Sequence, residues 1–284
     1  MATTKFSLTS RIQLNNGLSI PRIHLGVYMM TSREAYESVR WALDAGYRAI
    51  DSAQMYRNES DCGKAIREFL SANPTIKRSD IHFTTKLASN SSYDRARKAI
   101  SQSVKTCGLD YLDLFLLHSP YGGKQARLDS WRAVEDAIDA GEIKSGGVSN
   151  YGIKHLEELL ASKPRHMPVT NQIEVHPFNT RRELARWCQE HSIIVEAYAP
   201  LVRAMRMSHP TIVSLAKKYE YTPAQLLIRW SLQQGYVTLP KSATKQRIVS
   251  NALVDGQSIS EDDVMTMDGL DEGLVTDWDP TDTD

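Results

Sequence analysis

The sequence has few cysteines, no long apolar run and no secretion signal. Cys62, Cys107 and Cys188 lie far apart and form no Cys-x-x-Cys pair. This spacing excludes a disulfide framework and a cysteine-rich zinc site, and it is typical of a reducing compartment. No stretch approaches the roughly 18 uninterrupted apolar residues of a membrane-spanning helix, and the N-terminus has no apolar signal segment. We therefore expect a cytoplasmic protein that does not enter a membrane.

An excess of charge of either sign is also missing. Lys plus Arg and Asp plus Glu both number 34, so the formal net charge is zero. Without a positive field, the protein is not drawn as a whole to nucleic acid or to an anionic membrane. The expected partner is a small molecule, and the chain is expected to be a monomer or a weak dimer. A local anion site is still compatible with this balance.

The glycine-rich turn of dinucleotide-binding open sheets is absent. No Gly-x-Gly-x-x-Gly follows an early apolar stretch, and Gly146-Gly147 lacks the third glycine at the required spacing. A doubly wound open sheet that binds a dinucleotide would usually carry this turn after its first strand. The sequence therefore favours another α/β architecture.

Short apolar stretches alternate with amphipathic ones along the 284 residues, a length that fits an α/β barrel. Asn16-Gly17 between two apolar runs predicts an N-terminal β-hairpin over 11–20. The alternation predicts strands over 23–26, 47–50, 81–85, 112–117, 143–148, 169–175, 193–197 and 236–239. It predicts helices over 32–45, 58–70, 92–107, 125–140, 152–161, 180–191, 210–219, 222–234, 244–253 and 260–270, with caps at Ser32 and Asn58. Eight strand–helix units predict one (β/α)8 TIM-barrel domain over residues 1–284, with a short C-terminal tail.

Polar side chains follow the predicted strands at their carboxyl ends, where the active sites of such barrels lie. Any one of them alone is more often a cap, a solvated charge or a structural histidine. Three of them occupy equivalent places on adjacent strands, which is harder to attribute to chance. The polar strand ends are Asp51, Lys86, His118, Ser149 with Asn150, Gln172 with Glu174, Tyr198, and Lys241 with Ser242.

Asp51, Tyr56, Lys86 and His118 form the candidate catalytic group. Lys86 would neutralise Asp51, and its ammonium beside the Tyr56 hydroxyl is expected to lower the tyrosine pKa from about 10. Tyr56 would then donate a proton, while His118 orients a carbonyl oxygen. No nucleophile stands out, so the expected reaction adds hydride and a proton to a carbonyl group, and the hydride must come from a cofactor.

A second candidate site follows the last predicted strand. Lys241, Lys245 and Arg247, with the hydroxyls of Ser242 and Thr244, lead into a predicted helix and suit an anion at its N-terminus. Without context, a solvated basic helix start explains these residues equally well. A phosphate-bearing cofactor would account for both candidate sites.

Six of these segments together resemble the aldo-keto reductase superfamily, in particular its short-loop fungal and prokaryotic members. The resemblance extends over nearly the whole chain. Six motifs in the right order are highly specific, whereas one alone would be a weak sign. The motifs are Asp51-Ser-Ala-Gln-Met-Tyr56-Arg-Asn-Glu59 and the segments 112–118, 147–150, 171–177, 197–201 and 239–242.

The resemblance implies an NADPH-dependent reductase of aldehydes or ketones, in a family whose open pockets often take α-keto esters and diketones. Tyr56 would be the proton donor, and Asp51, Lys86 and His118 would complete a tetrad. Ser149, Asn150 and Gln172 would hold the nicotinamide carboxamide, and the Tyr198 ring would stack on it. Lys241, Ser242 and Arg247 would bind an adenosine 2′-phosphate, which favours NADPH over NADH. The remaining cofactor positions would be Gly26, Asp51, Leu201, Arg203 and Asn251.

Substrate would contact Tyr28, His118 and Trp278, in a pocket that the short loops are expected to leave open. Met29 and Tyr121 are further candidates, for which ordinary packing is an equally good explanation. Arg203 or Arg206 would contact phosphate or remain solvated.

Two other functions compete with this interpretation. A non-catalytic member of the same fold that binds cofactor as a regulatory subunit is the alternative, although the intact tetrad argues against it. A metal-dependent hydrolase that uses His118, Glu174 and His176 is weaker, because the chain has no His-x-His cluster. We expect no metal site.

Overall fold

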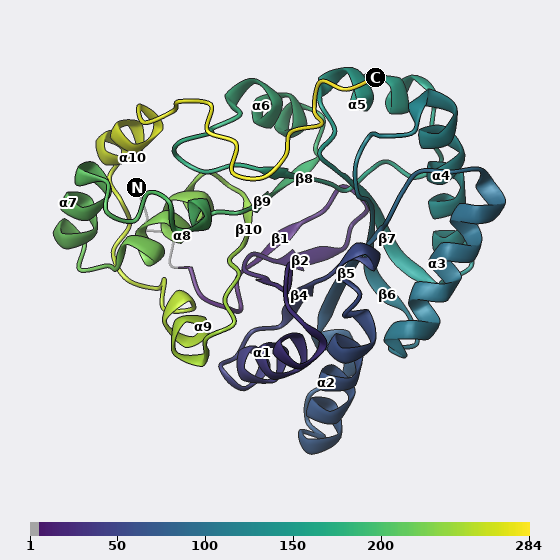
Figure 1. Ribbon diagram of the computed structural model, residues 1–284, viewed down its shortest axis with the longest axis horizontal. Coiled ribbons are helices and arrows are strands. Elements are labelled where there is room, and N and C mark those ends of the chain that lie inside the picture. The colour runs from purple at the N-terminus through teal and green to yellow at the C-terminus, as the bar shows by residue number, and fades with distance from the viewer. Residues whose placement is uncertain (1–5) are drawn as a thin grey trace.

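A parallel eight-stranded barrel forms the centre of the computed structural model, which describes residues 6–284 (Figure 1). The strands follow one another in the order β10-β9-β8-β7-β6-β5-β4-β3. Backbone hydrogen bonds from His24 N to Thr238 O (3.0 Å) and from Gly26 N to Pro240 O (3.1 Å) join the last strand to the first. The predicted TIM barrel is confirmed. Its strands are β3 Leu25–Gly26, β4 Ala49–Asp51, β5 His82–Leu87, β6 Leu112–Leu117, β7 Ile143–Ser149, β8 Thr170–Glu174, β9 Ile194–Tyr198 and β10 Val237–Leu239.

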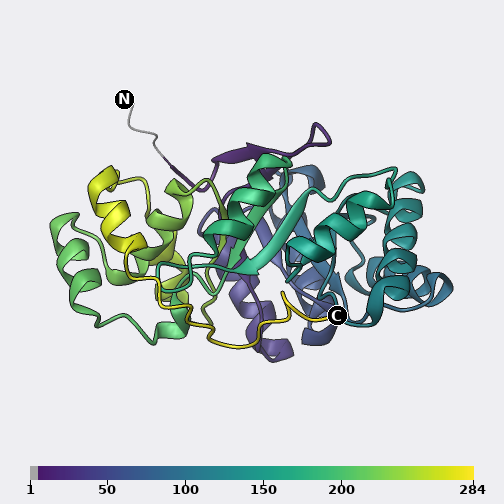
Figure 2. The same cartoon turned by 90° about the horizontal axis from the view of Figure 1, so that it is seen from above.

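Helices surround the barrel at the predicted places (Figures 1 and 2). Their amphipathic faces pack on the outer faces of the strands, so that Ile66, Trp131 and Leu226 are buried between the two layers. The helices are α1 Ser32–Asp44, α2 Glu59–Ala72, α3 Tyr93–Cys107, α4 Gly123–Asp139, α5 Ile153–Ala161, α6 Arg182–Glu190, α7 Pro210–Lys218, α8 Pro223–Gln233, α9 Lys245–Asn251 and α10 Glu261–Asp268.

One of the two predicted helix caps is wrong, and the other is confirmed in position. Thr31, not Ser32, caps α1: its side chain accepts a hydrogen bond from the backbone of Glu34, and the Glu34 carboxylate accepts one from the Thr31 backbone in return. Asn58 occupies the N-cap position of α2, as predicted, but its side chain makes no capping hydrogen bond. Its buried side chain instead donates to the carbonyl oxygens of Val27 (3.1 Å) and Met30 (3.2 Å), so it ties the start of α2 to the loop after β3.

The predicted hairpin is confirmed and closes one end of the barrel. Strands β1 (Arg11–Gln13) and β2 (Ser19–Pro21) pair antiparallel, and Gly17 takes the positive φ (83°) that the turn requires. Leu14 and Ile20 of the hairpin pack against Leu114 and Leu239 inside the barrel. Figure 2 shows the hairpin and the C-terminal tail at opposite ends of the barrel, so the tail, residues 269–284, crosses the carboxyl ends of the strands.

The free thiols of Cys62, Cys107 and Cys188 are all buried. No helix within the described part of the chain combines the length and apolar character that a bilayer crossing requires.

Candidate active site

A cavity of about 1020 Å³ opens at the carboxyl ends of the strands. The fold therefore gathers side chains that are far apart in the sequence around one space. All predicted cofactor and substrate positions line it, whereas Lys86 is fully buried and does not reach the cavity surface. The predicted residues at the cavity wall are Gly26, Tyr28, Asp51, Tyr56, His118, Ser149, Asn150, Gln172, Tyr198, Leu201, Arg203, Lys241, Ser242, Arg247, Asn251 and Trp278.

A buried ion pair forms the floor of this cavity. Lys86 faces into the barrel from β5, and its Nζ donates to Asp51 Oδ1 (2.5 Å), to the backbone oxygen of Ser52 (2.8 Å) and to the Tyr56 hydroxyl (3.4 Å). The Lys86 side chain has no exposed surface. The three acceptors thus satisfy an ammonium that would be very costly to bury alone.

The expected effect of Lys86 on Tyr56 is wrong in direction. Burial of the hydroxyl, and then the negative charge of Asp51, raise the pKa of Tyr56 well above 10. The Asp51 carboxylate binds the ammonium more closely than Tyr56 does, so the positive charge that reaches the phenol is largely compensated. Tyr56 is therefore protonated at neutral pH, which is the state a proton donor needs.

His118 follows β6 and lies beside Tyr56, with the two ring centroids 5.7 Å apart and edge to face. Burial, and then the nearby charge of Lys86, lower the pKa of His118 to about 3. The imidazole is thus neutral across the physiological range. A neutral ring can donate one hydrogen bond to a carbonyl oxygen without carrying a charge of its own.

The predicted carboxamide-binding residues form a hydrogen-bonded group in the cavity wall next to His118. Ser149 Oγ donates to the backbone oxygen of Gln172 (2.9 Å), and Asn150 Nδ2 donates to the backbone oxygen of His118 (3.0 Å). The Tyr198 hydroxyl donates to Asn150 Oδ1 (2.9 Å). Asn150 has a positive φ (60°), which asparagine tolerates better than most residues. These bonds fix the side chains before any ligand binds.

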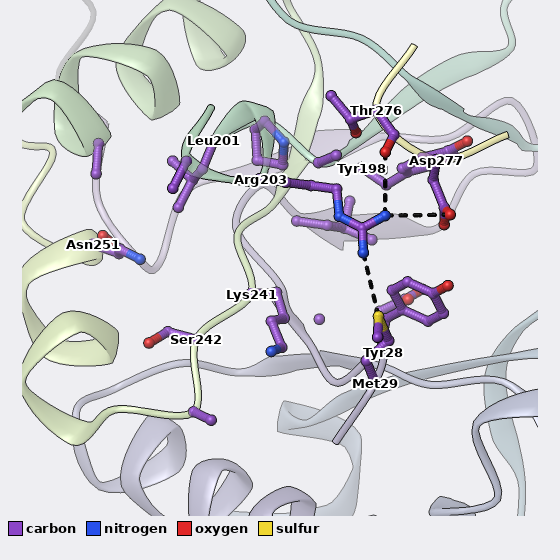
Figure 3. Close-up of a pocket in the computed structure, with 18 of the residues that line it drawn as sticks. Tyr28, Met29, Tyr198, Leu201, Arg203, Lys241, Ser242, Asn251, Thr276 and Asp277 are labelled. Atoms are coloured by element: carbon purple, nitrogen blue, oxygen red, sulfur yellow. Dashed lines mark hydrogen bonds and ion pairs between the residues drawn. The ribbon is translucent and has the colours of Figure 1, made fainter. Parts of the chain in front are cut away.

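Basic side chains lie at the far end of the cavity, on and before α9. Lys241 and Arg247 are exposed, and neither forms an ion pair within the described residues. Ser242 and Asn251 line the same wall, and Figure 3 shows Lys241 and Ser242 on the segment between β10 and this helix. Two cations without an ion-pair partner among the described residues, beside a hydroxyl and an amide, suit a phosphate group.

Arg203 spans the middle of the cavity, as Figure 3 shows. Its guanidinium contacts three segments: Asp277 (3.2 Å to Oδ1), the backbone oxygen of Thr276 (3.3 Å) and Met29 Sδ (3.3 Å). Arg206, the alternative candidate, lies outside the cavity wall and pairs with Glu272 instead (2.7 Å).

The loop that carries Arg203 is strained. Ala199, Val202, Arg203 and Ala204 all have φ values between 46° and 65°, a region in which non-glycine residues are disfavoured. Strain of this kind persists only where the surrounding structure holds it, and it is common at ligand sites.

Aromatic rings surround the other end of the cavity, next to Tyr56. Tyr28 lies 5.1 Å from Tyr56 and Trp278 lies 6.1 Å from His118, centroid to centroid. Met29 lines the cavity, whereas Tyr121 is not part of its wall and only packs against Trp278 (5.7 Å). The C-terminal tail thus supplies one wall of the pocket.

Thr276, Asp277 and Glu196 are among the residues in and around this site that were not predicted. Thr276 and Asp277 carry no signal in the sequence, because only the tertiary path of the tail brings them to the cavity. Thr276 is held by Glu174 Oε1, which accepts from its backbone (2.9 Å) and its hydroxyl (2.6 Å). Glu196 could have been found, because it is two residues before Tyr198 on β9 and must therefore face the barrel interior.

Known proteins resemble this chain over nearly its whole length. The model of the Aldo/keto reductase family matches residues 22–272. The chain belongs to this family. An uncharacterized oxidoreductase of Schizosaccharomyces pombe is 45% identical over 273 residues, covering 96% of this chain and 98% of that protein. The glyoxal reductase of Bacillus subtilis is 37% identical over 266 residues, covering 93% of this chain and 94% of that protein.

A solved structure shares the whole barrel. It is MGS-M4, an aldo-keto reductase from a Medee basin deep-sea metagenome, with a TM-score of 0.90 and 35% identity over 96% of this chain and 99% of that one. Membership of the family makes this chain an oxidoreductase of the class that reduces carbonyl groups with a nicotinamide cofactor.

Within residues 6–284, no group of three or more His, Cys, Asp and Glu side chains could hold a metal ion.

Proposed function

We propose that this protein is an NADPH-dependent reductase of aldehydes and ketones in which Tyr56 donates the proton. The observation that carries the proposal is the Tyr56 hydroxyl at the cavity wall, protonated and 3.4 Å from the buried Lys86 ammonium, with neutral His118 beside it. A carbonyl oxygen between Tyr56 and His118 would meet two hydrogen-bond donors. As the oxygen gains charge, the Tyr56 proton moves to it, and Lys86 stabilises the phenolate that remains.

The residues present fit a phosphorylated nicotinamide cofactor, which would supply the hydride. The cavity is long enough to have an aromatic end at Tyr56 and a basic end at Lys241 and Arg247. Ser149, Asn150 and Gln172 would hold the carboxamide, and Tyr198 would stack on the ring. Leu201, Arg203 and Gly26 would approach the pyrophosphate, and Asn251 the adenine. The exposed charges of Lys241 and Arg247 support NADPH over NADH.

The substrate end favours small, flat carbonyl compounds. Tyr28 and Trp278 form apolar walls beside Tyr56, and the relative named glyoxal reductase supports dicarbonyl compounds and aldehydes as the first substrates to test. We further propose that the protein acts in the cytoplasm, since its three thiols are free. We also propose that it is a monomer or a weak dimer.

The test measures NADPH oxidation with glyoxal, methylglyoxal and an aromatic aldehyde. Tyr56→Phe should reduce kcat by at least about a hundredfold, because general acid catalysis contributes this much or more, while the Kd for NADPH changes little. Tyr111→Phe removes a hydroxyl remote from the cavity and should leave turnover unchanged. Undiminished turnover by Tyr56→Phe would refute the proton donor. Tight NADPH binding by the unaltered protein, without turnover of any carbonyl compound, would favour the non-catalytic alternative.

A further inference from the structure

A second buried acid lies beneath the cavity floor and is linked to the tetrad through one amide group. Glu196 faces the barrel interior from β9 and is fully buried. Its Oε2 accepts a hydrogen bond from Gln172 Nε2 (3.1 Å), and the same nitrogen donates to Asp51 Oδ2 (2.9 Å). The two carboxyl groups therefore share the two amide protons of Gln172.

This sharing fixes which way the Gln172 amide points. If the amide were turned over, its oxygen would lie next to two carboxyl oxygens, and both contacts with ionised groups would be repulsive. When the amide nitrogen faces the two carboxyl groups, the amide oxygen of Gln172 points away from them. It accepts no hydrogen bond from any described residue, and Gln172 lines the cavity. Glu196 and Asp51 together thus present a hydrogen-bond acceptor at the cavity wall.

Glu196 also brings a negative charge that the site does not fully compensate. The charged groups that face it are Asp51 from β4 and Lys86 from β5, and Lys86 is already paired with Asp51. Its partners on the flanking strands, Gln172 on β8 and Val237 on β10, are uncharged. Burial, and then the Asp51 charge, raise the pKa of Glu196 to about 7. Hydrogen bonds to the carboxylate and the charge of Lys86 oppose this rise without cancelling it.

We propose that Glu196 is a positioning residue for the nicotinamide ring: through Gln172 it orients the acceptor that holds the carboxamide, and its charge discriminates between the oxidised and reduced ring. This inference rests on the proposed function, since it assumes that the nicotinamide lies beside Gln172. The oxidised ring is cationic and the reduced ring is neutral. An ionised Glu196 therefore favours NADP⁺ over NADPH, and a protonated Glu196 loses this preference.

The experiment measures the Kd of NADPH and of NADP⁺ by calorimetry between pH 6 and pH 8.5. Titration of the 2′-phosphate affects both ligands alike and cancels in their ratio. In the unaltered protein, the ratio Kd(NADP⁺)/Kd(NADPH) should fall several-fold as pH rises through the ionisation of Glu196. In Glu196→Gln, which keeps the volume and an acceptor oxygen, the ratio should not vary with pH. Glu59→Gln is the matched control, because Glu59 is a buried acid that bonds Thr85 (2.7 Å) and does not touch Gln172.

Glu196→Leu tests the orienting role. It leaves one Gln172 proton without an acceptor and should weaken NADPH by about tenfold, the effect of losing one hydrogen bond to a charged group. Binding of 2′-phospho-ADP-ribose, which lacks the nicotinamide ring, should be unchanged. In a protein that already carries Gln172→Met, the addition of Glu196→Leu should weaken NADPH no further, because the role acts through that amide.

Two results would overturn the proposal. One is a ratio in Glu196→Gln that changes with pH as it does in the unaltered protein. The other is equal weakening of NADPH and 2′-phospho-ADP-ribose in Glu196→Leu, which would indicate a general structural defect. If Glu196→Leu does not fold, the Glu196→Gln measurement decides alone. Carbonyl reduction by the unaltered protein and its loss in Tyr56→Phe test the proposed function separately, so failure here would leave that function standing.

Discussion

Replacement of Lys86 by methionine should destabilise the protein strongly, in addition to abolishing turnover. Methionine fills much of the same volume but removes the ammonium that donates to Asp51 (2.5 Å), Ser52 (2.8 Å) and Tyr56 (3.4 Å). Asp51 would keep only the Gln172 bond (2.9 Å) and would lie buried near a second acid, Glu196. Loss of one partner from a buried ion pair costs about 3–5 kcal/mol, most of it from the charge left behind.

The measurement is urea-induced unfolding at pH 7.5, followed by circular dichroism. We expect the free energy of unfolding to fall by about 4 kcal/mol in Lys86→Met, which corresponds to a melting temperature about 10 °C lower for a chain of this size. The double variant Asp51→Asn/Lys86→Met should recover at least about 1 kcal/mol of this loss, because no uncompensated charge remains. Lys105→Met, which removes an exposed ammonium from α3, should change stability by less than about 0.5 kcal/mol.

Two outcomes would contradict this reasoning. A loss below about 1 kcal/mol in Lys86→Met would mean that Asp51 is solvated or already protonated in the folded protein. A double variant less stable than Lys86→Met would mean that the packing and hydrogen bonds of these side chains, and not their charges, hold the floor of the cavity together.

The remaining predictions concern the two ends of the cavity and its floor. Arg247→Ala should weaken NADPH at least tenfold while NADH changes little, and equal weakening of both ligands would exclude a 2′-phosphate contact. Asp277→Asn should raise the KM for the carbonyl substrate several-fold in steady-state assays. Its effect on unfolding should stay below about 1 kcal/mol, because its pair with Arg203 is about one-third exposed. Ala204→Gly should stabilise the protein by about 1 kcal/mol in urea titrations, since φ is 65° there. Glu196→Gln should gain stability relative to the unaltered protein as pH rises from 4.5 to 7, by at most about 3 kcal/mol. The native Glu196 pKa of about 7 exceeds its usual 4.5, so the Glu196 carboxyl group makes the unaltered protein less stable as pH rises through that window. A stability difference between Glu196→Gln and the unaltered protein that is the same at pH 5 and pH 8 would refute this.

The barrel could be predicted from the sequence because its strands and helices differ in local pattern. Buried parallel strands such as 112–117 are continuous apolar runs, and the helices between them carry apolar residues on one face. The site followed from the same pattern, since Asp51, Lys86 and His118 each stand where a strand ends. Only the topology was needed to bring them together.

The parts that could not be predicted depend on contacts between distant segments. Thr31 and Asn58 show this for helix ends: Thr31 caps α1 through Glu34, while Asn58, an equally good cap by type, is used to hold the loop at Val27 and Met30. The tail shows it for the cavity. No local sequence pattern places Asp277 against Arg203, because the two residues are 74 positions apart in the chain.

The direction of the Tyr56 pKa shift was predicted wrongly because the Lys86 ammonium was considered without its ion-pair partner, Asp51. Lys86 is shared among three oxygens, and the nearest belongs to Asp51. With Glu196 included, the floor holds two carboxyl groups for one ammonium, while His118 contributes no positive charge. Such a floor disfavours a negative charge on Tyr56, so Tyr56 stays protonated until a substrate oxygen takes its proton. The same balance of charges favours a proton on Glu196. The balance of the whole group, and not the Lys86–Tyr56 pair alone, sets the protonation state from which the proposed reaction starts.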